Sequence, residues 1–173
     1  MIQESILKTN VLVLGSGPAG FSAAYIAAKH GAQVILVEQS GDVGGIATSG
    51  LMSHWTGSCN SPLYYEILKR SADLNDGKHK GQITRFIDPE KLKILLLEML
   101  DEVGVKLFLY SFAEDAIMDG NKVLGASIIN KSGRIKIYAD TVIDATGDGD
   151  IAANFFGIIV RNGVAVGILA HTV

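Results

Sequence analysis

The segment Val11 to Glu38 constrains the fold of this chain more than any other part of it. It contains an apolar run, a Gly15-x-Gly17-x-x-Gly20 turn, an amphipathic stretch, a second apolar run and a terminal acid. The stretches 10–14 and 33–37 are rich in β-forming residues and predict two strands. Between them, apolar residues recur at helical spacing and Gly31 is placed to end the helix. The pattern predicts a βαβ unit.

The glycine turn predicts a site for a dinucleotide. Gly15 allows a tight turn, Gly17 allows the backbone to approach a pyrophosphate, and Gly20 allows the helix to pack closely on the sheet. The helix N-terminus offers free N–H groups and positive dipole charge to phosphates. Glu38 lies 18 residues beyond Gly20, where a carboxylate can accept hydrogen bonds from ribose hydroxyls. The alternative is an ordinary βαβ turn whose glycines serve packing only.

The middle of the chain predicts a long loop, two helices and a strand. Glycines recur from Gly41 to Gly57, which makes this loop too long for a simple turn. Ser61-Pro62 precedes an expected helix from about Leu63 to Leu74, with Leu63, Ile67 and Leu68 inward. A polar break follows at 75–81. Asp88-Pro89 begins a second helix that ends near Val103, and Val105 to Tyr110 reads as a buried strand.

Three further β-runs predict an antiparallel meander. They are 112–118, 122–130 and 134–139, and turn signals at Asp119-Gly120 and Ser132-Gly133 separate them. A short apolar strand, 141–145, then leads into Thr146-Gly147-Asp148-Gly149-Asp150. We expect Asp148 or Asp150 to be the N-cap of a helix over 151–156.

This order of elements, with GSGPAG, Glu38, VGGIATSG and VIDATGDGDIAA, resembles the FAD-dependent oxidoreductases of the glutathione-reductase-like group. The similarity is greatest to the branch that carries an Ala-Thr-Gly-Asp-Gly-Asp segment, and it extends from Val11 to about Phe156. It implies an α/β, Rossmann-like FAD/NAD(P)-binding fold, with a central parallel sheet, helices and a three-stranded antiparallel β-meander. It also implies that FAD is the cofactor and that the chain is part of a flavin-dependent oxidoreductase.

The resemblance implies a cofactor-binding role for residues in five segments. The glycine turn would hold the pyrophosphate, Glu38 the adenosine ribose, and the glycine-rich loop the ribityl chain. The start of the meander would meet the adenine, and the Ala-Thr-Gly segment would pass close to the cofactor. The predicted cofactor-binding residues are Gly15, Ser16, Gly17, Pro18, Ala19, Gly20, Glu38, Gln39, Gly44, Gly45, Ala47, Thr48, Phe112, Ala113, Ala145, Thr146, Gly147 and Asp148.

Composition limits the other possibilities. The net charge of −3 provides no basic face for nucleic acid, and no apolar stretch is long enough to span a membrane. Cys59 is the only cysteine, which rules out an internal disulfide and fits a reducing cytoplasm. The four histidines are scattered, so we expect no metal site. We expect His54 and Trp55 to pack over the loop rather than to act in catalysis.

Family members are typically much longer than this chain, so we expect residues 1–173 to form a single, incomplete FAD-binding domain. The substrate domain and the C-terminal flavin-site segment would be absent, and the closing stretch 158–173 has no clear match. The substrate would be an unidentified small molecule, and a second copy or a partner could supply the missing part. Three alternatives stay open: a truncated nucleotide-binding module without catalysis, an NAD-binding domain of a dehydrogenase, and, remotely, a methyltransferase. Glu38 disfavours NADP, because its charge would repel a 2′-phosphate.

Overall fold

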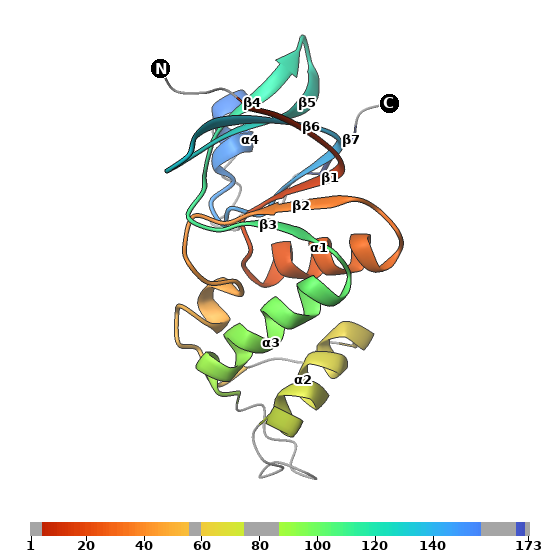
Figure 1. Cartoon of the computed structure of the whole chain (residues 1–173), viewed down its shortest axis with the longest axis vertical. Helices are drawn as coiled ribbons and strands as arrows, with labels where there is room; N and C mark the ends of the chain where they lie inside the picture. The colour runs from red at the N-terminus through yellow and green to blue at the C-terminus, as the bar shows by residue number, and fades with distance from the viewer. Residues whose placement is uncertain (1–4, 56–59, 75–86, 157–168, 172–173) are drawn as a thin grey trace.

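The computed structural model describes residues 5–55, 60–74, 87–156 and 169–171. Its strands form one sheet in the order β3-β2-β1-β6-β5-β4, with β7 paired to β6 (Figure 1). The pairs β1–β2, β1–β6 and β2–β3 are parallel, whereas β4–β5, β5–β6 and β6–β7 are antiparallel. The α/β, Rossmann-like class with a β-meander is therefore confirmed. The strands are β1 (Ser5–Leu14), β2 (Val34–Val37), β3 (Lys106–Phe108), β4 (Phe112–Asp119), β5 (Lys122–Asn130), β6 (Gly133–Asp144) and β7 (Leu169–His171).

Helices gather on one face of the parallel strands. In Figure 1, α1 (Pro18–Lys29), α3 (Pro89–Glu102) and α2 (Pro62–Leu74) lie together below β1, β2 and β3. Proline begins each of the three, as expected for a residue without an N–H at the first helical position. Asp88 caps α3 as predicted, because its carboxylate accepts hydrogen bonds from the N–H groups of Glu90 and Lys91.

Alternation along β1 produces two apolar cores. Val13 points into a core with Phe21, Leu96 and Met99 from the helices. Its neighbours Leu12 and Leu14 point the other way, into a core formed with the meander and with α4 (Asp150–Phe156). A short 3₁₀ helix, η1 (Gly45–Ala47), follows β2. Both faces of the central strands are therefore covered.

Two strand predictions need correction. The runs 134–139 and 141–145 are not separate strands, because β6 continues through Asp140. The Asp140 carboxylate accepts a hydrogen bond from the Asn10 side chain at 3.0 Å, so a polar residue at this position does not interrupt pairing. For the same reason β1 begins at Ser5 rather than near Asn10.

The strand predicted as buried at 105–110 is a short edge strand. It spans Lys106 to Phe108, with Lys106 exposed and the other two residues half-buried, because β3 pairs only with β2 on the path through the sheet. Cys59, the polar break at 75–81 and most of the closing stretch lie outside the described residues.

Candidate nucleotide-binding site

A cavity of about 350 Å³ lies where β1, β2 and β6 end and β4 begins. Ligands of open α/β sheets bind outside the carboxyl ends of the strands, which is this edge. The walls come from the glycine turn, the end of β2, η1, the start of β4 and the segment after β6. The lining residues are Gly15, Gly17, Pro18, Ala19, Val37, Glu38, Gln39, Gly45, Ile46, Ser111, Phe112, Ala113, Ala145, Thr146, Gly147 and Asp150. We call this space the nucleotide cavity.

The glycine turn packs tightly on one side and is open on the other. A Cβ atom on Gly20 would overlap the carbonyl oxygen of Gly15, and a Cβ on Gly15 would overlap that of Ala145. Around Gly17, by contrast, no described atom lies within 4 Å of where a Cβ would stand. Gly17 is the N-cap of α1, and no side chain in the described part of the chain caps that helix. The uncapped N–H groups therefore remain available to an anion.

Glu38 is held by the glycine turn itself. One carboxylate oxygen accepts hydrogen bonds from the N–H (2.8 Å) and hydroxyl (2.7 Å) of Ser16, and the other from the Ser40 N–H (2.8 Å). Burial would raise the pKa of Glu38, but these hydrogen bonds outweigh it and the pKa is lowered. Glu38 is therefore an anion at neutral pH that faces the nucleotide cavity and keeps acceptor capacity for a hydroxyl group.

The segment after β6 is anchored by Asp144. Its Oδ1 accepts hydrogen bonds from the N–H and hydroxyl of Thr146, and its Oδ2 accepts one from the Ala152 N–H at 2.9 Å. The Thr146 hydroxyl in turn accepts a hydrogen bond from the Asp150 N–H. The first N–H groups of α4 are thus satisfied by Asp144 and Thr146, and the predicted capping by the Asp148 or Asp150 side chain is not what the structure shows.

The structure brings twelve of the eighteen predicted residues to the nucleotide cavity. Ser16 and Thr48 are fully buried instead, and the Thr48 hydroxyl donates to the Val43 carbonyl oxygen at 2.6 Å. Gly20 is occupied by helix packing, and Gly44 and Ala47 line a different pocket. Asp148 is exposed and does not line the cavity.

Four lining residues were not predicted: Val37, Ile46, Ser111 and Asp150. Three of them adjoin a predicted residue in the sequence, so extending each predicted segment by one position would have found them. Asp150 lines the cavity because the bend after Thr146 returns the chain toward it, which is a feature of the tertiary structure.

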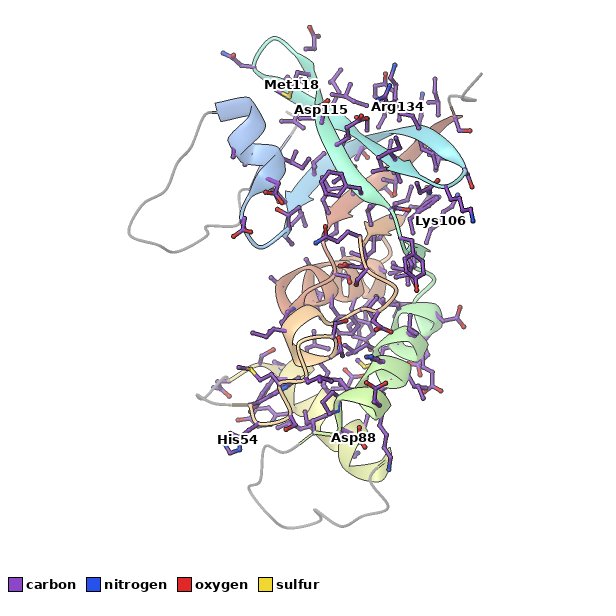
Figure 2. The ribbon with its side chains drawn as sticks, turned by 90° about the vertical axis from the view of Figure 1, so that its left-hand side faces the viewer. His54, Asp88, Lys106, Asp115, Met118 and Arg134 are labelled. Carbon is purple, nitrogen blue, oxygen red and sulfur yellow. The ribbon has the colours of Figure 1, made fainter. Side chains whose placement is uncertain are left out.

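The remaining candidate residues are placed away from this cavity. Figure 2 shows His54 near Asp88, at the opposite end of the molecule from Asp115, Met118 and Arg134 of the meander. Trp55 stacks on Tyr64 of α2. Within the described ranges, no cluster of His, Cys, Asp or Glu could hold a metal ion. Across the same ranges, no helix has the length and apolar character needed to cross a membrane.

Comparison with protein families gives one match across most of the chain. Residues 10–163 match the model of the FAD dependent oxidoreductase family. A digeranylgeranylglycerophospholipid reductase from Picrophilus torridus is 27% identical over 80% of this chain and 39% of that protein. A thiamine thiazole synthase from Pyrococcus abyssi is 27% identical over 90% of this chain and 65% of that protein. The chain thus spans less than two thirds of the length of these curated relatives.

Solved structures show the same fold. A geranylgeranyl bacteriochlorophyll reductase-like protein from Thermoplasma acidophilum superposes with a TM-score of 0.65 at 22% identity, covering 91% of this chain and 45% of that one. THI4 from Thermovibrio ammonificans gives 0.62 at 23% identity, covering 87% of this chain and 64% of that one.

Proposed function

The chain belongs to the FAD dependent oxidoreductase family, and on that premise we propose that its nucleotide cavity holds the ADP half of FAD. The observation that carries this proposal is the empty space in front of Gly17, at the uncapped start of α1. A pyrophosphate placed there would receive backbone N–H groups without meeting a side chain. The residues present therefore fit the cofactor that the family uses.

Each wall of the nucleotide cavity has a task in this proposal. Glu38 would accept hydrogen bonds from the ribose hydroxyls, with its orientation fixed by Ser16 and Ser40. Phe112 and Ala113, at the start of β4, would contact the adenine, and Ala145 to Gly147 would bring small side chains close to the cofactor. Bound FAD would supply two-electron redox chemistry, and the chain would supply its binding and orientation.

Thermal shift with three nucleotides tests this assignment. We expect FAD and ADP-ribose both to raise the Tm of the purified chain, because both carry the ADP group that the cavity would hold. FAD should also produce the visible absorbance of a bound oxidised flavin after desalting. A Tm that rises with NAD but not with FAD would overturn the proposal in favour of a dehydrogenase-type domain.

Residues 1–173 would act as one FAD-binding domain in a flavin oxidoreductase, with the substrate-binding part contributed from outside this sequence. Support for this division comes from the relatives, which extend well beyond the matched region. The activity, the small-molecule substrate, an association with a second copy or a partner, and a cytoplasmic location stay predictions.

A further inference from the structure

A second and larger cavity lies between α1 and α2. Its volume is about 610 Å³, within the range of roughly 300–1,000 Å³ that small-molecule sites occupy. Most of its wall is apolar, with Phe21 and Ile26 from α1, Leu63 and Ile67 from α2, Leu96 from α3, and Trp55 from the loop after η1. We call it the α1/α2 pocket.

The α1/α2 pocket is separate from the nucleotide cavity. Gly44 and Ala47 line the α1/α2 pocket, whereas Gly45 and Ile46 between them line the nucleotide cavity. Pro18 is the one residue that lines both. The start of α1 and η1 therefore form a thin wall with a different cavity on each side.

The charged groups on the rim of the α1/α2 pocket neutralise one another. Lys29 and Glu66 line it and form an ion pair at 3.2 Å. Glu66 also accepts hydrogen bonds from Tyr25 (3.0 Å) and Arg70 (2.8 Å). His30 lies exposed at the rim with its Nδ1 at 3.1 Å from the Ile26 carbonyl oxygen. Burying an ion among apolar side chains is costly, so this pocket favours a neutral ligand.

Trp55 adds one specific polar requirement. Its Nε1 is inaccessible to solvent and has no hydrogen-bond partner among the described residues. The ring is fixed by stacking on Tyr64, with the centroids 6.0 Å apart. A buried donor that stays unpaired is unfavourable, so an acceptor at this place would stabilise the bound state.

We propose that the α1/α2 pocket binds a neutral, largely apolar small molecule whose carbonyl-type oxygen accepts a hydrogen bond from Trp55 Nε1. The apolar wall, the internally paired rim and the unpartnered indole N–H each select one property of this ligand. The inference does not rest on the proposed function, because the nucleotide cavity is a different space.

Displacement of the neutral dye Nile red from the full chain tests the location of the site. Ile26 is 40% exposed and lines the pocket, so Ile26→Trp would fill its mouth without altering the core. Ile94 is 57% exposed on α3 and does not line the pocket, so Ile94→Trp is the matched control. We expect Ile26→Trp to weaken dye binding about tenfold or more, and Ile94→Trp to change it less than about twofold. Equal effects would overturn the proposal.

Two competitors of similar shape test the role of Trp55. Benzophenone carries a carbonyl oxygen and diphenylmethane does not. Trp55→Phe keeps an aromatic ring and removes the donor, so it should weaken benzophenone about five- to tenfold relative to diphenylmethane, as expected for one hydrogen bond. An equal loss for both competitors would show that the indole N–H is not used.

Two further measurements separate this inference from its rivals. Gly17→Val, which blocks the nucleotide cavity, should leave benzophenone affinity unchanged, so the two proposals can fail independently. If Ile26→Trp instead turns a dimer into a monomer in sedimentation, and Nile red does not bind the wild type, a second copy occupies the pocket and the proposal is wrong.

Discussion

Gly17 and Gly20 lie three residues apart and are glycines for different physical reasons. Gly20 faces the backbone of its own turn, where a Cβ atom would overlap the Gly15 carbonyl oxygen. Gly17 faces open space and has φ −58° and ψ −178°, a conformation that other residues adopt readily. The sequence motif predicts both glycines, but only the structure shows which one faces the cavity.

This difference predicts opposite outcomes for two substitutions. Gly17→Val should leave the Tm nearly unchanged and weaken FAD binding at least about tenfold, because the side chain would occupy the place of the pyrophosphate. Gly20→Ala should lower the free energy of unfolding by about 1–3 kcal/mol, because the helix must move away from the turn. Thermal melts and flavin titration of both variants check this. Wild-type FAD affinity in Gly17→Val would contradict the site.

Glu38 predicts a pH dependence of stability. Its folded-state pKa is lowered, so its contribution is fully present above the ordinary glutamate pKa of about 4.3 and is lost as the pH falls through the folded-state pKa. Glu38→Gln replaces an acceptor with an amide that cannot accept from both Ser16 and Ser40, and should cost about 1–3 kcal/mol at pH 7. Denaturant unfolding from pH 7 to pH 3 should show this cost shrinking as the pH falls. A cost that is constant with pH would contradict the assignment.

At the level of elements, the predictable parts are those with local signals. Proline and Asp88 mark the start of α3, its apolar spacing identifies Leu92, Leu95 and Met99 as core, and β5 matches its predicted bounds. Asp144 was missed because its partner Ala152 is eight residues away, across a bend whose path the sequence does not specify. The α1/α2 pocket was missed for the same reason, since it depends on how helices from distant segments pack.

The anchoring of the segment after β6 by Asp144 predicts local rather than global loosening. Asp144→Ala removes the acceptor of the Ala152 N–H, so hydrogen exchange at Ala152 should accelerate by about tenfold or more and FAD binding should weaken. Asp148→Ala is the control, because Asp148 is exposed and lies in the same bend. If Asp148→Ala weakens FAD binding more than Asp144→Ala does, the cofactor contacts lie further along the bend than proposed.

A chain of ion pairs connects the three helices. Glu66 of α2 pairs with Lys29 of α1 and with Arg70, and Arg70 pairs with Glu102 of α3 at 2.8 Å. These groups are partly exposed, so Glu66→Ala should cost no more than about 1 kcal/mol, and the cost should shrink in 1 M salt. Glu98→Ala, at an exposed position on α3, is the control. Urea unfolding at two salt concentrations measures both, and a salt-independent cost would indicate that Glu66 acts through packing.

For the whole molecule, an apolar rim beside the nucleotide cavity predicts association. Ile46, Leu51 and Met52 are 57%, 65% and 43% exposed, and the Met52 N–H donates to the Ile46 carbonyl oxygen, so the three lie together. Clustered exposed apolar side chains favour contact with another surface. Sedimentation should therefore show concentration-dependent association that Ile46→Ser with Leu51→Ser reduces and Ile94→Ser does not. Equal behaviour of the two variants would exclude the rim as the contact.

The continuity of β6 ties the meander permanently to the rest of the domain. One edge of this strand pairs with β5 and the other with β1, and its last residue, Asp144, orients the bend at the cavity. Excising β4 and β5 would expose an unpaired strand edge in the middle of the molecule, which invites aggregation. The meander is thus no removable insertion: shortened versions of this domain, whether engineered or arising by gene rearrangement, should survive trimming of surface loops but not loss of this hairpin.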